Sequence, residues 1–151
     1  MKIAYVNNEE MFNILFNKET FLPVLQENEN HIFKNWKYFS ANDFDLSDRY
    51  YIVAYEENLT AENIIAVLKY GIYMRGDHWG LSYVDVKEGH KHQGLGKKLI
   101  SLFSKIDFSK YDVDVKDKRI YISFFSDECL EKHFDEKVKE TFKNLDVVYR
   151  T

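Results

Sequence analysis

The sequence contains little cysteine, proline or glycine: one cysteine, one proline and six glycines among 151 residues. Since a disulfide needs two cysteines, Cys129 cannot form one within the chain, and a lone thiol suits the reducing cytoplasm. Glycine and proline mark turns and linkers. Their scarcity, with no repeat and no low-complexity tract, predicts one domain over residues 1–151.

The sequence also lacks an excess of positive charge and any long apolar run. Its formal net charge is −4, which argues against nucleic acid as a partner, because that binding needs a basic face. No apolar run approaches the length of a membrane span, and the N-terminal residues show no signal-peptide pattern. We therefore expect a cytoplasmic protein that binds neither nucleic acid nor membrane.

The apolar residues, 45% of the chain, are distributed as in a globular α+β protein. Three segments rich in β-branched and aromatic residues, 49–55, 63–74 and 79–86, are joined by short turns and predict an antiparallel meander. The other expected elements, in chain order, are a strand at 2–6, a helix from Met11, a helix after Pro23, a helix from Leu95, a strand at 119–125, a helix capped by Ser126 and a strand at 146–150.

Two of the six glycines, Gly94 and Gly96, stand where the helix from Leu95 begins. A helix N-terminus presents unpaired amides and a positive dipole end, and glycine lets an anion approach the backbone closely. The neighbouring basic residues are His90, Lys91, His92, Lys97 and Lys98. A pyrophosphate is therefore the expected ligand. The Walker A and dinucleotide-binding patterns both fail here, the first at Leu95 and the second at Leu99.

The segment Lys91-His92-Gln93-Gly94-Leu95-Gly96 resembles the acetyl-CoA loop, [QR]-x-x-G-x-[GA], of the GNAT N-acetyltransferase superfamily. The resemblance covers roughly residues 50–143. It implies a mixed, mostly antiparallel sheet, flanked by helices, whose strands splay apart at the cofactor cleft. It also implies that the backbone from Lys91 to Lys97 holds the pyrophosphate, that Val84 and Val86 pair with the pantetheine arm, and that the Val84 amide polarises the thioester carbonyl.

Three positions depart from the family's pattern. Lys91 replaces Gln or Arg, Gly80 stands where the family often has a Glu base, and His133 replaces the usual Tyr acid. Asp85 is a candidate substitute base, on the expectation that regular alternation puts it on the face of Trp79, Leu81 and Tyr83. His133 is the candidate general acid. Further candidates are His78, expected in a turn, Tyr121 and Tyr149. We expect no metal at the His90-x-His92 pair.

By this resemblance the chain is expected to move an acetyl group from acetyl-CoA to a primary amine by direct attack in a ternary complex. The amine, on a small molecule or a protein, is expected to enter over residues 20–48. One strand follows the last helix where the family usually has two, so a second subunit is one way to complete the acceptor site. The alternative is a CoA-binding module that has lost catalysis and has a regulatory or protein-binding role.

Overall fold

The computed structural model describes residues 1–16, 49–73, 78–111, 117–123 and 147–150. These residues form one six-stranded sheet in the order β1-β2-β3-β4-β5-β6. The strands are β1 Lys2–Asn7, β2 Arg49–Tyr55, β3 Ile64–Tyr73, β4 His78–Val86, β5 Asp117–Ser123 and β6 Val147–Arg150. The helices are α1 Asn8–Leu15 and α3 Leu95–Ser104, with 3-10 turns η2 Ala61–Asn63 and η3 Phe108–Lys110.

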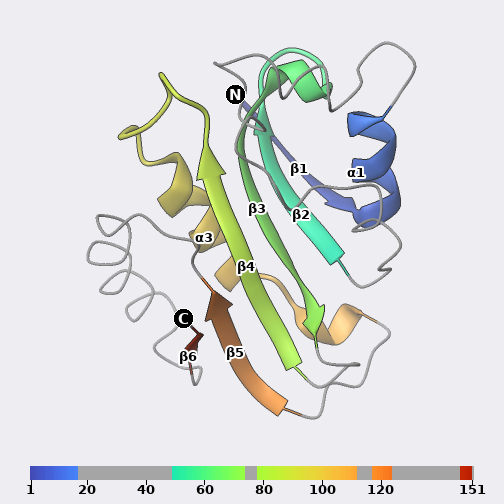
Figure 1. Ribbon diagram of the computed structural model, residues 1–151, viewed down its shortest axis with the longest axis vertical. Coiled ribbons are helices and arrows are strands. Elements are labelled where there is room, and N and C mark those ends of the chain that lie inside the picture. Colours follow the sequence, from blue (N-terminus) through green and yellow to red (C-terminus); the bar gives the residue numbers. More distant parts are fainter. Residues whose placement is uncertain (17–48, 74–77, 112–116, 124–146, 151) are drawn as a thin grey trace.

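The sheet is mixed, as the sequence predicts (Figure 1). Strands β1 to β4 pair antiparallel with their neighbours. Strands β5 and β6 add in parallel, each after a long connection. The predicted meander is therefore confirmed: its first strand has the expected bounds, its second is one residue shorter at each end, and its third begins one residue earlier. The helices expected after Pro23 and after Ser126 lie outside the described residues.

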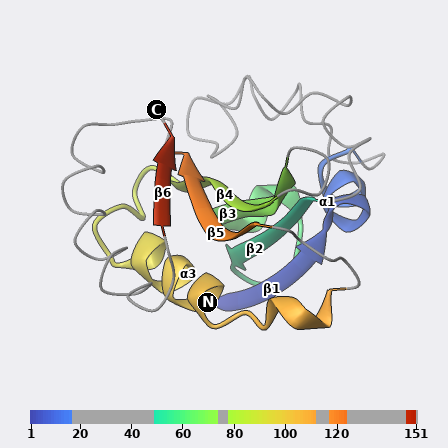
Figure 2. The same ribbon diagram turned by 90° about the horizontal axis from the view of Figure 1, so that it is seen from below.

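Each face of the sheet carries its own apolar cluster. Helix α3 contributes Leu99, Ile100 and Phe103 to the cluster that includes Leu68 and Leu81 of the sheet. Helix α1 packs Met11 and Leu15 against the other face. Burying a Leu or Phe side chain contributes about 1.5–3 kcal/mol, so α3 is firmly anchored along its length. Figure 2 shows α3 and η3 along one side of the sheet.

Helix α1 begins with a capping box that the sequence pattern Asn7-x-x-Glu10 encodes. The Asn7 side chain accepts from the Glu10 amide at 2.8 Å, and the Glu10 carboxylate accepts from the Asn7 amide at 3.3 Å. These two bonds satisfy amides that the first helical turn leaves without partners. Among the described residues, no helix has the length and apolar character needed to cross a membrane.

Candidate active site

Strands β4 and β5 lie side by side over only part of β4. Their register runs from His78 opposite Asp117 to Leu81 opposite Ile122. From Tyr83 to Val86, β4 is paired with β3 and, within the described part of the chain, with no strand on its other side. A strand edge that loses its neighbour presents backbone donors and acceptors to a ligand. Within the described residues, the end of this pairing agrees with the splayed strands expected from the sequence.

A β-bulge at Ser82 marks the point where the strands part. Lys69 is opposite Tyr83 and Tyr70 is opposite Leu81, so Ser82 has no counterpart in β3. A bulge inverts the alternation of side chains beyond it. Leu81 and Val84 consequently face the α3 side of the sheet together.

The bulge corrects one expectation about Asp85. Asp85 lies opposite Val67, which belongs to the apolar cluster on the α1 side. It therefore does not share a face with Trp79 and Leu81, which pack toward α3. The expectation was wrong because it assumed regular alternation, and a serine in an alternating strand gives no sign of a bulge. Asp85 lies instead on the face that carries Gly80.

The backbone of β4 directs the Val84 amide toward the open side of the strand. The Lys87 amide donates to the Ile65 carbonyl of β3 at 2.7 Å. Since such bonds alternate along an antiparallel ladder, the amides of Val84 and Val86 point away from β3. The Val86 amide donates to Asp85 Oδ1 at 2.8 Å. Val84 and Val86 were both expected to pair with pantetheine. The Val86 amide is bound by the Asp85 carboxylate, whereas the Val84 amide points at the gap with no such carboxylate in front of it.

The loop between β4 and α3 has a left-handed backbone at three positions. The φ angles are +91° at Gly89, +66° at His92 and +79° at Gly94. Gly94 is the N-cap of α3, and its position carries no capping side chain. A Cβ added at Gly94 would meet no atom within 4 Å, so the backbone angle, and not crowding, requires glycine there. The N-cap residue therefore supplies no side chain that could bind the first amides of α3.

The polar side chains of this loop are turned toward solvent. Lys91, His92, Gln93 and Lys97 are exposed, while Leu95 is buried and fixes the start of the helix to the core. Lys91 Nζ lies 3.2 Å from Glu88 Oε2, and both side chains are largely exposed. Exposed pairs of this kind contribute little to stability. Lys91 can therefore exchange Glu88 for another anion at low cost.

Some of the other candidates from the sequence lie within the residues that the structure describes, and some lie outside them. His133 and residues 20–48 lie outside the described part of the chain. His78, expected in a turn, is the first residue of β4, with only 2% of its surface exposed. Its ring lies 4.1 Å, centroid to centroid, from that of Tyr121 on β5. Sequence spacing could not reveal this contact, because it depends on the parallel pairing of β4 with β5.

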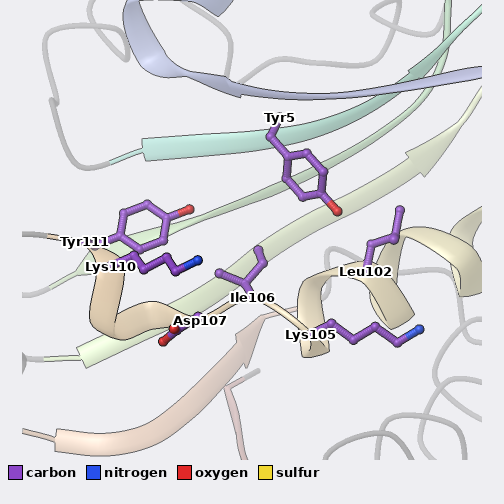
Figure 3. Close-up of a pocket in the computed structure, with 7 residues that line it drawn as sticks. All are labelled: Tyr5, Leu102, Lys105, Ile106, Asp107, Lys110 and Tyr111. Atoms are coloured by element: carbon purple, nitrogen blue, oxygen red, sulfur yellow. The ribbon is translucent and has the colours of Figure 1, made fainter.

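A shallow pocket of about 540 Å³ lies elsewhere, between β1 and the end of α3 (Figure 3). Tyr5, Leu102 and Tyr111 are among the residues that line it. This pocket is at the C-terminal end of α3, whereas the glycine loop is at the N-terminal end. It is therefore separate from the parted strands. No group of three or more potential metal ligands occurs among the described residues.

The chain belongs to the acetyltransferase (GNAT) family, which it matches over residues 9–113. No curated protein matches it. One similar solved structure is the aminoglycoside acetyltransferase meta-AAC0020 from an uncultured soil metagenomic sample, in complex with trehalose. It is 15% identical, with 91% of this chain and 86% of that chain covered and a TM-score of 0.56.

Two further solved structures share the fold. Tetrahymena GCN5 is 10% identical, with 91% of this chain and 78% of that chain covered and a TM-score of 0.51. The enzyme AAC(6')-Iy, in complex with the bisubstrate analogue CoA-S-monomethyl-acetylneamine, is 10% identical, with coverage of 91% and 88% and a TM-score of 0.52. Identities this low support the common fold, and the family membership identified from residues 91–96 is confirmed.

Proposed function

We propose that this chain transfers the acetyl group of acetyl-CoA to a primary amine, by direct attack within a ternary complex. The observation that carries the proposal is the start of α3. Its first turn has no capping side chain, its N-cap glycine is left-handed, and it follows directly from the strand that parts from β5. These are the features that a diphosphate and an extended acyl-carrying arm require.

The proposal gives the backbone from Lys91 to Lys97 the role of holding the diphosphate. The Val84 amide, directed at the gap, is assigned to the thioester oxygen, where a donor stabilises the charge that develops during attack. Val86 contributes to the pantetheine site through its carbonyl, because its amide is bound by Asp85. Lys91 is a point charge for phosphate where the family usually has Gln or Arg.

Proton transfer is the step for which the chain departs most from its family. An amine of pKa about 10.4 is neutral in about one of 2,500 molecules at pH 7, a deficit of about 4.6 kcal/mol. Gly80 cannot remove that proton. The sequence offers Asp85 as base and His133 as acid. We retain both as proposals, and Asp85→Asn tests the first of them directly.

Two measurements test the function. Saturating CoA should raise the unfolding midpoint, because ligand at 100 times its Kd adds about 2.7 kcal/mol. Thiol release from acetyl-CoA should then be followed with a polyamine, an aminoglycoside, a lysine peptide and an α-amine. CoA binding with no turnover on any amine would favour the alternative, a binding module that has lost catalysis. No CoA binding would refute both.

The acceptor is proposed to be a small-molecule or protein amine. Aminoglycosides belong in the panel because two of the matched structures are aminoglycoside acetyltransferases. We propose further that a second copy of the chain completes the acceptor site. Light scattering with and without CoA measures the number of chains.

A further inference from the structure

The pocket at the C-terminal end of α3 is separate from the parted strands, and nothing in the proposed function uses it. Its floor is apolar, since Leu102 and Ile106 are partly buried against the core. Figure 3 shows the Tyr111 hydroxyl and the Lys110 ammonium directed into the space in front of Ile106. The Tyr5 ring borders the same space from β1. A volume of about 540 Å³ is within the range of sites that hold small organic molecules.

The Tyr111 ring is held in place by its neighbours. Its centroid lies 4.8 Å from that of Tyr50 and 5.1 Å from that of Trp79, both edge to face. The Tyr111 amide also donates to the Phe108 carbonyl at 3.2 Å, which closes the turn η3 before it. A group that is already fixed loses little conformational entropy when a ligand binds. Tyr111 is therefore positioned for binding before a ligand arrives.

The Tyr111 hydroxyl has a hydrogen to donate into the pocket. Its oxygen lies 2.6 Å from the Tyr70 oxygen, and neither hydroxyl has another partner among the described residues. Tyr70 has only 1% of its surface exposed, and a buried hydroxyl hydrogen needs an acceptor. Since each hydroxyl carries one hydrogen, Tyr70 donates and Tyr111 accepts. The hydrogen of Tyr111 remains for an acceptor atom in the pocket.

The charges around the pocket favour an anion. The charged residues that line it, within the part of the chain that the structure describes, are Lys105, Lys110 and Asp107. Neither lysine forms an ion pair with another described residue. Figure 3 shows Lys105 and Asp107 directed away from Tyr5, which leaves Lys110 as the cation directed into the pocket. A carboxylate can accept hydrogen bonds from Lys110 and Tyr111 at once, because it has two oxygens.

We propose that this pocket is a second ligand site of the chain, and that it binds a small aromatic monocarboxylate. The carboxylate accepts from Tyr111 and Lys110, and the ring packs between Tyr5 and Ile106. Tyr5 is 53% exposed, so covering its ring removes apolar surface from water. The excess of one positive charge among the lining residues matches one carboxylate. The inference goes beyond the proposed acetyl transfer and does not depend on it.

Three probes of one shape test the charge of the ligand. Benzoate, benzamide and benzylamine share a ring and are respectively anionic, neutral and cationic. Each is titrated into isotope-labelled wild-type protein at constant pH and ionic strength, and the backbone amide resonances are followed. Benzoate should shift those of Tyr5 and of residues 102–111 until they saturate, with a Kd on the order of 1 mM. Benzamide should bind about tenfold more weakly or less, and benzylamine should give no shift.

Three variants test the geometry. Lys110→Gln and Tyr111→Phe should each raise the Kd for benzoate about tenfold or more, because each removes a hydrogen bond to a charged group. Lys105→Gln is the matched control. It removes the same charge from the same segment, but its side chain points away from Tyr5, so in a screening buffer the Kd should change less than about threefold. Lys110 is exposed, so its substitution leaves the fold intact even where Tyr111→Phe does not.

A competition with CoA separates this site from the parted strands. Saturating CoA should leave the benzoate shifts in place, because the two ligands occupy opposite ends of α3. Displacement of benzoate by CoA overturns the inference, and so does the absence of a saturable shift. Equal binding of the three probes, or equal effects of Lys105→Gln and Lys110→Gln, would mean that the pocket selects no ligand, and would also overturn it. None of these results bears on the acetyl transfer, which thiol release tests separately.

Discussion

Replacing Gly94 by alanine should separate the folding role of the glycine loop from its binding role. Gly94 has φ of +79° and no atom within 4 Å of an added Cβ. A left-handed conformation costs an L-residue about 1–2 kcal/mol. Alanine also lowers the conformational entropy of the unfolded chain, which stabilises the folded state by about 0.4–1 kcal/mol. The net loss in unfolding free energy should therefore be about 1 kcal/mol, or roughly 2–4 °C in Tm.

The same substitution should weaken CoA binding by more than this loss of stability. The added methyl group projects into the open space from which a diphosphate would approach the first amides of α3. Losing one good hydrogen bond to a charged group costs about 1.5–3 kcal/mol, which corresponds to a 10- to 150-fold rise in Kd. Isothermal titration with CoA measures the Kd, and thermal unfolding of the free protein measures the stability.

Gly89→Ala is the matched control. Gly89 has φ of +91° and is equally open to an added Cβ, so it should lose a similar amount of stability. It lies five residues before the N-cap and outside the segment assigned to the diphosphate, so its Kd should change less than threefold. Equal effects of the two substitutions on Kd would refute the idea that the amides at the start of α3 hold the diphosphate.

Three further substitutions test other parts of the structure. Leu99→Ala removes a fully buried side chain of α3 and should cost about 2–5 kcal/mol in urea unfolding; a loss under 1 kcal/mol would mean that α3 does not pack as described. Tyr70→Phe removes the hydroxyl bonded to that of Tyr111 at 2.6 Å and should cost about 1 kcal/mol. Burial, with that bond, raises the pKa of Tyr70. Stability is therefore complete below about pH 10, where the unfolded tyrosine titrates, and declines above it; Tyr70→Phe should reduce this decline, and an unchanged decline would contradict the assignment. Asp85→Asn keeps an acceptor for the Val86 amide, so Tm should change little, and a 100-fold fall in kcat would identify Asp85 as the base, whereas an unchanged kcat would exclude it.

The strands were predictable because their residues carry the signal locally. Arg49–Tyr55 alternates and is rich in β-branched and aromatic side chains, and its observed bounds are those expected. The capping box of α1, Asn7 followed three residues later by Glu10, is also a local signal, but the helix was expected to begin at Met11 and begins at Asn8. The bulge at Ser82 was not, since Trp79, Leu81, Tyr83 and Asp85 alternate as they would in a regular strand. The face on which Asp85 lies depends on pairing with β3, and a single strand does not encode that.

The cofactor-binding part and the proton-transfer part of the site likewise differ in whether the sequence alone predicts them. A ligand held by main-chain amides leaves a local trace, because the backbone must be left-handed and the residue must be glycine, as at Gly94. Proton transfer leaves no such trace, since any titratable side chain that the sheet brings to the reacting nitrogen can perform it. His78 and Tyr121 are far apart in the sequence and meet only because β5 adds in parallel beside β4. When Gly80 removes the family's usual base, its replacement therefore has to be sought among the residues that the sheet brings together, and not in the local sequence.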